Sequence, residues 1–461
     1  MTTADLLQVE QPGAGEAFPP ATDGSVAAHP VSRAYRRYVM WVLLAICTLN
    51  FLDRQIVNIL AEPIKHEFGL KDRQIGMLTG FYFAVFYSVL SIPLARLADR
   101  GNRSWLITAA LGLWSLFTVA SGFARAYLQL AVLRLLVGVG EAGGSPTAQS
   151  LITDYHPRGE RARAIAFYTI GIPIGSLLGL AMGGLVLDRF GWRTAFVIAG
   201  APGLLLAVLT GLTLKEPRKH AALAAEPAPR LSEAFRELAS KRSFILLTIG
   251  GCLVTFVNYG QGAFLPSFFF RNHASGLAAI AAGWSHATGI HFGPAGVLGL
   301  CLGICSGIGG IAGTLFGGWL TDKMAARDLT AYVTLQVWFT LARIPLVAVA
   351  FTVGQPLVAI LFVSLAAACM GVAGAPGYAA IQGLVRPRVR ATAIAIFLLG
   401  LNLLGLGLGP LCVGLMSDAF GHAAGSGSGL RLSLLAAQLA LVAAAGVMYA
   451  AKPFFVAETV S

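Results

Sequence analysis

Twelve long apolar stretches, separated by short polar segments, dominate the sequence. Each holds about 20 or more mostly apolar residues, the length that an α-helix needs to cross a bilayer. We therefore predict an all-α polytopic membrane protein with twelve transmembrane helices. The expected spans are 38–61, 74–97, 104–123, 127–150, 161–187, 193–213, 244–270, 294–320, 329–353, 356–380, 390–417 and 430–451.

The composition excludes an ordinary soluble protein. The 461 residues are 56% hydrophobic and only 12% charged, whereas soluble domains carry about 25% charged residues. The formal net charge of +12 could indicate a nucleic-acid partner. The basic residues lie between the spans rather than in one patch, so we expect a lipid bilayer and no nucleic acid.

The distribution of positive charge predicts the orientation. With the N-terminus inside, 22 of the 33 Lys and Arg residues fall in inner segments and 8 in outer ones. Positive residues gather on the cytoplasmic side of membrane proteins. We expect a protein of the plasma (inner) membrane with both termini cytoplasmic.

The longest inner segment divides the spans six and six. The expected organisation is a disordered cytoplasmic tail over 1–37, a six-helix bundle over 38–214, a cytoplasmic linker over 215–243, a second bundle over 244–453 and a tail over 454–461. Within the linker, Ser232 could cap a short amphipathic helix that presents Leu231, Phe235 and Leu238.

The two halves resemble each other in sequence. The segment 161–171 aligns without gaps to 390–400, and 140–143 aligns to 371–374. Asp99 and Asp322 fall at matching hairpins. Such a repeat is typical of transporters whose halves move about a central site, so we predict two pseudo-symmetric bundles.

Two further segments bear on helix packing and metal binding. Glycines recur every fourth residue from Gly171 to Gly183, a spacing that favours close helix packing. The outer segment 271–293 holds three histidines without a neighbouring thiol or carboxylate. We expect it to be a solvated loop, with no metal and no cofactor.

The hairpin Ala95-Arg-Leu-Ala-Asp99-Arg100-Gly-Asn-Arg103 and the segment Gly317-Gly-Trp-Leu-Thr-Asp322-Lys323 resemble the loop motif of the major facilitator superfamily. A carboxylate at a helix end can interact with a neighbouring helix dipole and with arginine. We expect a cytoplasmic gate made by Asp99, Arg100, Arg103, Asp322 and Lys323. Ala95 and Asn102 replace two glycines of the family motif, so packing there is expected to differ.

Charges at membrane depth are costly and usually paired or facing a cavity. The first span contains Asp53 and Arg54, and the fourth contains Arg134 and Glu141. Arg134 and Glu141 are seven residues apart and share one helix face, about 10.5 Å apart along the axis, too far to pair with each other. Asp53 and Arg54 point about 100° apart, so each needs a partner on another helix.

The segments Asn50-Phe-Leu-Asp53-Arg54 and Arg134-Leu-Leu-Val-Gly-Val-Gly-Glu141-Ala, together with the Asp99 loop, resemble the Spinster family. The resemblance implies transport of lysophospholipids or sphingosine-type lipids. It also implies a role in coupling or substrate contact for Asp53 and Glu141. An acid whose arginine contact changes between conformations changes its proton affinity, and a released arginine can bind a phosphate. We therefore assign proton coupling to the two acids and substrate binding to Arg54 and Arg134.

Further polar residues in the predicted spans are candidates for lining the site: Asn50, Tyr82, Tyr87, Asn258, Gln261 and Asn402. Arg343 in the ninth span either belongs to the site or lies near the outer face and snorkels, and the sequence leaves both open.

The sequence thus favours a monomeric, proton-coupled secondary transporter of amphipathic lipids, with small organic anions or drugs as the alternative substrates. An enzyme would need a nucleophile–base pair or a metal set at membrane depth. No histidine falls within the predicted spans, and there is no phosphate-binding Gly-Lys-Ser loop. A non-transporting receptor is also disfavoured, because the buried charges are present.

Overall fold

The computed structural model describes residues 32–217, 231–386 and 389–459, which are helical with no strand among them. The first six spans are built from α1 (Arg33–Phe68), α2 (Asp72–Gly76), η1 (Met77–Phe81), α3 (Tyr82–Arg100), α4 (Arg103–Ser121), α5 (Tyr127–Glu141), α6 (Gly144–Tyr155), η2 (Arg158–Glu160), α7 (Arg161–Thr169) and α8 (Gly171–Thr213). The rest are built from α9 (Leu231–Ser240), α10 (Arg242–Asn272), α11 (Ala274–Thr288), α12 (Pro294–Ala325), α13 (Ala331–Thr352), α14 (Pro356–Gly383), α15 (Arg390–Gly400), η3 (Leu401–Leu408), α16 (Gly409–Ala424), α17 (Ser426–Ala437) and α18 (Leu439–Glu458).

These elements form the twelve predicted spans. Within the described residues, ten helical stretches are long and apolar enough to cross a membrane, and one of them, 163–213, contains both the fifth and the sixth span. The chain turns between these two at Gly191, where φ is 78°, a conformation that glycine adopts without steric cost. The fourth span is the interrupted pair α5 and α6, which carries Arg134 and Glu141.

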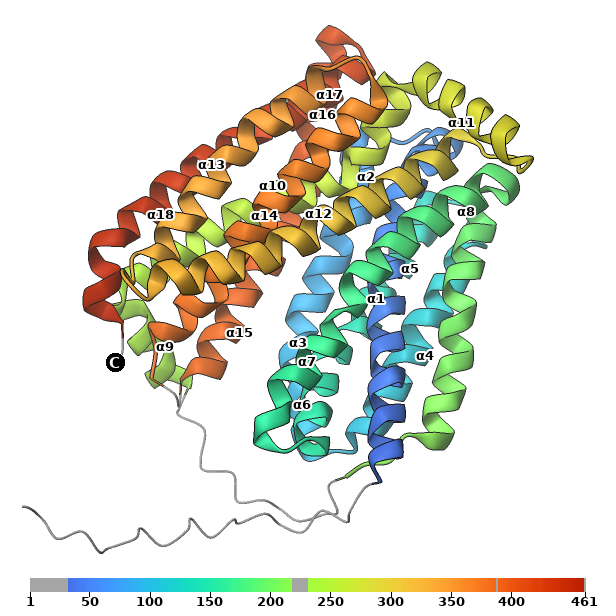
Figure 1. Cartoon of the computed structure of the whole chain (residues 1–461). Helices are drawn as coiled ribbons and strands as arrows, with labels where there is room; N and C mark the ends of the chain where they lie inside the picture. The colour runs from blue at the N-terminus through green and yellow to red at the C-terminus, as the bar shows by residue number, and fades with distance from the viewer. Residues whose placement is uncertain (1–31, 218–230, 387–388, 460–461) are drawn as a thin grey trace, which may run out of the picture.

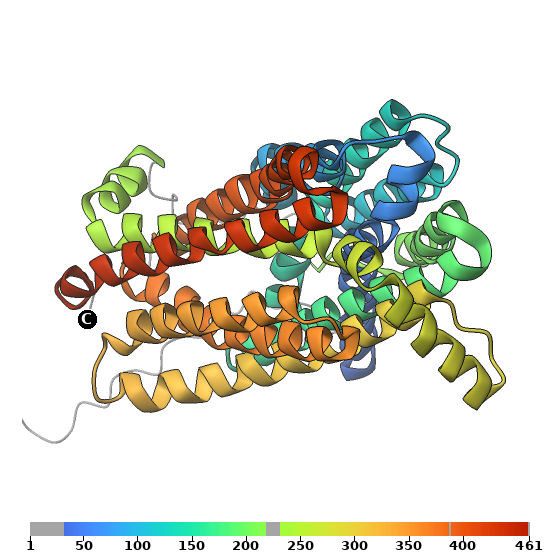
Figure 2. The same ribbon diagram turned by 90° about the horizontal axis from the view of Figure 1, so that it is seen from above.

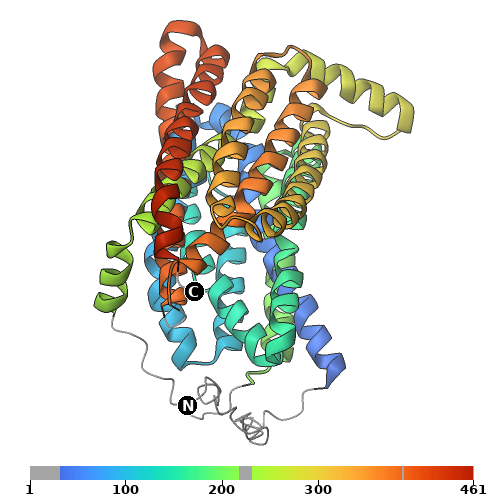
Figure 3. The ribbon, with the colours of Figure 1, turned by 60° about the vertical axis from the view of Figure 1, so that its left-hand side comes forward.

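The spans form two groups that meet at one end of the molecule (Figure 1). The end that carries α11 is called the α11 end below, and the opposite end, which carries α9, the α9 end. Both α1 and α18 have their terminal ends at the α9 end (Figures 1 and 3). Seen from above, α12, α13 and α14 lie together on one side of the second group, and α17 and α18 on the other (Figure 2).

Contacts between the halves lie toward the α11 end. On one face of α12, Gly299 and Gly303 approach the α8 backbone at Leu180 and Leu177. One turn further along, nothing lies within 4 Å of the Cβ position of Gly307. The two helices therefore diverge toward the α9 end.

Element boundaries differ from the expected domain limits at both ends. Helix α1 begins at Arg33, five residues before 38, and Ser32 caps it by accepting a bond from the Tyr35 amide at 3.2 Å. Helix α18 continues to Glu458, five residues past 453, and Phe455 is buried. Burial of the Phe455 ring accompanies the continuation of the last helix into the segment that we assigned to a tail.

The outer segment 271–293 is mostly a helix, so the expectation of a solvated loop is wrong. Helix α11 buries Leu277 and Ala281 and ends at Gly289 in the left-handed conformation. His273 is buried beside the rings of Phe268 and Phe269. Burial lowers the pKa of the His273 imidazole, so the ring is neutral at physiological pH. No cluster of three metal-ligating side chains occurs among the described residues.

The regularly spaced glycines of the fifth span pack against α1. A Cβ on Gly175 would lie 2.2 Å from the Thr48 carbonyl oxygen, and one on Gly179 would lie 2.6 Å from that of Leu52. Only hydrogen fits in such a space, so the repeat sets the distance between the first and fifth spans.

We predict that Gly175→Ala destabilises the protein, because overpacking a tight helix contact costs about 1–3 kcal/mol. The matched control is Gly446→Ala, since the Cβ position of this helical glycine has nothing within 4 Å. Scanning fluorimetry in detergent should give a lower melting temperature for Gly175→Ala only. Equal melting temperatures would show that the α1–α8 approach does not limit stability.

Candidate functional site

Two crossed ion pairs join the first and fourth spans. Arg54 Nε donates to Glu141 Oε2 at 2.7 Å, and Arg134 Nη1 lies 3.5 Å from Asp53 Oδ1. The neighbours Asp53 and Arg54 on α1 are thus paired with Arg134 and Glu141, which lie two turns apart on α5. The four charges cancel within one buried cluster.

The Asp53–Arg134 pair is closed to its surroundings. Asp53 and Arg134 are each only 3% exposed. Asp53 Oδ2 accepts a bond from Thr118 Oγ1 at 2.5 Å, which connects the pair to α4. Arg134 Nε has no hydrogen-bond partner among the described residues.

The Arg54–Glu141 pair is more exposed than the Asp53–Arg134 pair, and one of its carboxylate oxygens lacks a hydrogen bond within the described residues. The Arg54 side chain is 15% exposed, and its guanidinium lies over the rings of Phe51, Phe83 and Tyr87 at 5.2, 4.8 and 4.7 Å. Such cation–π contacts hold the cation in an apolar wall. Glu141 is 1% exposed, and its Oε1 has no partner in the described part of the chain. An unsatisfied carboxylate oxygen at this depth is a position for a proton.

The other candidate residues of the first half divide between two places. Tyr87 stacks on Phe83 beneath Arg54, and Asn50 is buried, with no hydrogen-bond partner for its Oδ1 in the described ranges. Tyr82 instead lies 3.4 Å from the Tyr127 hydroxyl and packs against a separate core cluster. No contact connects Tyr82 to the charge cluster within the described residues.

The second half contains a buried arginine with amide partners. Arg343 is 5% exposed, donates through Nη2 to Gln261 Oε1 at 3.0 Å, and donates through Nη1 to Asn258 Oδ1. The option that Arg343 snorkels near the outer face is therefore wrong: two neutral acceptors on α10 hold it inside the bundle. Asn402 is half-buried in η3.

The expected cytoplasmic gate is not assembled across the halves. Arg103 is fully buried, but its carboxylate partners are Asp154 of the first half and Glu216 just after the first-half helix α8, and neither belongs to the second half. Asp322 and Lys323 are exposed, and Lys323 lies over the Trp319 ring of its own helix. The side chains of Asp99 and Arg100 are outside the described residues.

Two aspartates close the opposite end in matching ways. Asp188 at the end of the fifth span accepts from the backbone N–H of Ala295 and Gly296 at 3.2 and 2.6 Å, at the start of α12. Asp418 of α16 accepts from the N–H of Asp72 and Arg73 at 2.8 and 3.0 Å, at the start of α2. Each half thus supplies a carboxylate to a helix N-terminus of the other half, where the helix dipole favours negative charge.

An ion-pair network reinforces this closure. Arg271 of α10 binds Glu62 of α1 and Asp72 of α2, with all four donor–acceptor distances at 2.8 Å. Asp72 also accepts from Lys65 at 2.6 Å and from Ser417 at 2.6 Å. We name the Asp188, Asp418 and Arg271 contacts together the α11-end latch.

The sequence reasoning missed this latch. The available signal is a repeat: Leu185-Val-Leu-Asp188-Arg-Phe-Gly191 matches Leu415-Met-Ser-Asp418-Ala-Phe-Gly421. The glycine before each repeat also has a matching role, because a Cβ on Gly184 would meet the Ala295 carbonyl at 2.1 Å and one on Gly414 would meet that of Asp72 at 2.5 Å.

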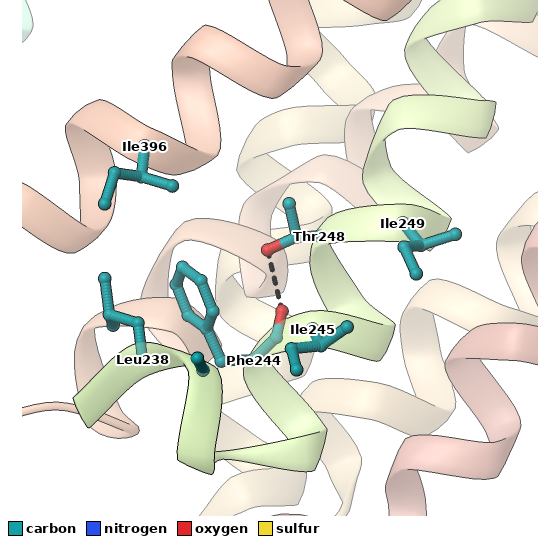
Figure 4. Close-up of a pocket in the computed structure, with 7 residues that line it drawn as sticks. Leu238, Phe244, Ile245, Thr248, Ile249 and Ile396 are labelled. Carbon is teal, nitrogen blue, oxygen red and sulfur yellow. Dashed lines mark hydrogen bonds between the residues drawn. The ribbon is translucent and has the colours of Figure 1, made fainter. Parts of the chain in front are cut away.

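An apolar pocket of about 230 Å³ lies between the linker helix α9 and helices α10 and α15 (Figure 4). Leu238, Phe244, Ile249 and Ile396 are among its lining residues, and Thr248 donates its hydroxyl to the Phe244 carbonyl at 2.7 Å. With no titratable group in its lining, this pocket offers no coupling chemistry, unlike the charge cluster.

Comparison with known proteins identifies the family. The family model described as Major Facilitator Superfamily matches residues 43–307. The chain belongs to the Major Facilitator Superfamily. An MFS-type efflux pump of Mycolicibacterium smegmatis is 35% identical over 87% of this chain and 90% of the pump.

Within this superfamily the chain resembles the Spinster proteins. Protein spinster homolog 1 of Rattus norvegicus is 32% identical over 57% of this chain, which spans about half (51%) of that relative. The crystal structure of a bacterial homolog of the human lysosomal transporter Spinster, in an inward-facing and unoccupied conformation, is 30% identical, with a TM-score of 0.81. The match covers 94% of this chain and all of that one. These matches support a transporter rather than an enzyme.

We predict that removing a latch carboxylate loosens the helix N-terminus that it caps. Loss of such a cap costs about 0.5–2 kcal/mol, or roughly a two- to thirtyfold change in an opening equilibrium. In hydrogen-exchange mass spectrometry, Asp188→Ala should speed exchange at Ala295 and Gly296, and Asp418→Ala at the first turn of α2.

The matched control is Asp328→Ala, since the exposed Asp328 carboxylate accepts its hydrogen bonds from Thr330 in the same turn at the α9 end. It should leave exchange at the starts of α2 and α12 unchanged. Unaltered exchange in both latch variants would mean that the carboxylates do not hold the α11 end.

Proposed function

We propose that the protein is a proton-coupled secondary active transporter that moves lysophospholipid or sphingosine-type lipids by alternating access. The observation that carries this proposal is the Arg54–Glu141 pair, a buried but partly accessible ion pair with an unsatisfied carboxylate oxygen. The likeness to Spinster proteins supports it. The proposal includes a monomer in the plasma (inner) membrane with both termini cytoplasmic.

Alternating access is supported by the unequal state of the two ends. The latch joins the halves at the α11 end, while Asp322 at the α9 end is exposed and forms no hydrogen bond or ion pair with the first half among the described residues. With the α9 end assigned to the cytoplasm by its positive charge, this arrangement corresponds to an inward-facing conformation. The inward-facing form of the bacterial Spinster homolog supports the same assignment.

Proton coupling follows from the chemistry of a pair that can open. While Arg54 contacts Glu141, the neighbouring cation favours the ionised form of the carboxylate. If Arg54 leaves, a buried carboxylate without a counter-charge takes up a proton instead. The inward-facing state with the pair formed is then the deprotonated state, and proton uptake accompanies the change to the other state.

Substrate recognition follows from the surroundings of Arg54. Its guanidinium is bounded by Phe51, Phe83 and Tyr87, so a cation and an apolar wall lie side by side. An amphipathic lipid can place its head group against the cation and its chain along the aromatic rings. Asn50 and Tyr87 complete this side of the proposed site, with Asn258, Gln261 and Asn402 on the other half.

Small organic anions or drugs are the second candidate substrates. The observation that favours them is the similarity to an MFS-type efflux pump over most of both chains. The same arginines can bind a carboxylate or phosphate without an acyl chain.

The test is transport by protein reconstituted in liposomes. A labelled lysophospholipid should move faster with an inward proton gradient, and Glu141→Gln should abolish the acceleration because the amide cannot take up a proton. The matched control is Glu160→Gln, since Glu160 forms an exposed ion pair with Arg36 at 3.4 Å.

Glu160→Gln should keep the gradient response within about twofold, since exposed pairs contribute little. If folded wild-type protein moves no lysolipid under either condition, the lipid substrate is wrong, and organic anions become the substrates to test. A gradient response that persists in Glu141→Gln would instead remove Glu141 from the coupling step.

A further inference from the structure

Arg343 differs from the other well-buried arginines in what it binds. Arg54, Arg134, Arg103 and Arg271 each form an ion pair with at least one carboxylate. Arg343 donates to the side-chain oxygens of Asn258 and Gln261, and no carboxylate pairs with it among the described residues.

This difference leaves one uncompensated positive charge at membrane depth. The four charges of the first-half cluster cancel, whereas two neutral amides supply only partial negative charge to Arg343. A buried guanidinium is costly without a counter-charge. The second half therefore holds a cation that an anion would stabilise.

The position of Arg343 relates it to the transport site. Tyr259 lies between the two amide residues in sequence, and it packs against the first-half core cluster that contains Phe83, together with Tyr87. These are rings that face Arg54. One turn of α10 thus contacts the aromatic wall around Arg54 and also holds Arg343.

The two amide side chains differ in how easily a ligand could displace them from Arg343. Gln261 is buried, while Asn258 is only half-buried. When an anion displaces the Asn258 oxygen from Arg343, a neutral amide is released and no charge is left unpaired. At Arg54 the same displacement would leave the Glu141 carboxylate without its cation.

We infer that Arg343, held by Asn258 and Gln261, is an anion-binding subsite of the second half, which takes the phosphate or carboxylate of the transported substrate. A substrate oxygen replaces Asn258 Oδ1 as the acceptor for Arg343 Nη1, and the charged acceptor gives the stronger bond. The inference rests on the proposed transport function and adds to it that the substrate carries a negative charge.

The test is equilibrium binding to purified full-length protein in detergent. The probes are lysophosphatidylglycerol, an uncharged monoacylglycerol of the same chain length, and benzoate as a water-soluble anion. Wild type should bind at least one of the two anions. Arg343→Gln should weaken binding of that anion about 10- to 100-fold, since hydrogen bonds to charged groups are among the stronger ones, and change monoacylglycerol binding less than twofold.

Asn258→Asp is a second variant. It keeps Arg343, so the result does not depend on whether the protein folds without this arginine. It places a carboxylate beside Arg343, so the site neutralises itself and competes with the anion. We expect a higher melting temperature than wild type and anion affinity at least tenfold weaker. A structural arginine that binds no substrate would give the higher melting temperature without the loss of affinity.

The outcomes separate this inference from the proposed function. If wild type binds lysophosphatidylglycerol and both variants bind it equally well, the subsite is wrong while lipid transport stands. If wild type binds benzoate but neither lipid, the lipid substrate is wrong, and weaker benzoate binding in Asn258→Asp still supports the subsite. Wild-type protein that binds neither anion would overturn the subsite.

Discussion

The low polarity of the bilayer is the constraint on which the structure depends, because it forces each buried charge to find a partner. Asp53 and Arg54 are adjacent on α1 and cannot satisfy each other, so α5 supplies Arg134 and Glu141 at a spacing of two turns. This crossed arrangement fixes the rotation of both helices about their axes. It also creates two unlike pairs, one closed by Thr118 and one partly open beside aromatic rings. The open pair is where binding and protonation can act.

The second organising feature is the exchange of carboxylates between the halves. Asp188 and Asp418 occupy equivalent positions in the two halves, and each caps a helix N-terminus of the other half. Gly184 and Gly414, one turn before them, allow the backbones to approach closely enough for these bonds. Because the bonds of Asp188 and Asp418 run to backbone N–H groups, they can be exchanged with water when the halves separate. The Arg271 ion pairs with Glu62 and Asp72 add a charged contact to the same end.

The sequence predicts the parts of the structure that depend on hydropathy and on helical periodicity. The twelve spans and the partners required by Asp53, Arg54, Arg134 and Glu141 belong to this class. Helix α11 was missed because a short Ala- and Gly-rich segment has no strong helical periodicity. The environment of Arg343 was missed because its amide acceptors carry no charge.

The α11-end latch escaped prediction for a different reason. Asp188 and Asp418 accept hydrogen bonds from backbone N–H groups. Almost any residue supplies such a donor, so the donor positions cannot be recognised in the sequence. Only the repeat around the two aspartates carries a signal. Tyr82 was predicted to line the site, but its hydroxyl contacts Tyr127 instead. A polar side chain in a span can form a local contact, and the sequence alone does not distinguish the two roles.

The central claim is that the protonation state of Glu141 sets which end of the molecule is open. The most direct measurement is the distance between spin labels at the exposed positions Gly159 and Ala326, one in each half at the α9 end. It is made by pulsed electron–electron double resonance at acidic and neutral pH, with the native cysteines replaced. Acidification should shorten the distance in wild-type protein, and Glu141→Gln should show the short distance at both pH values. A Glu141→Gln protein that keeps the wild-type response to pH would contradict the account.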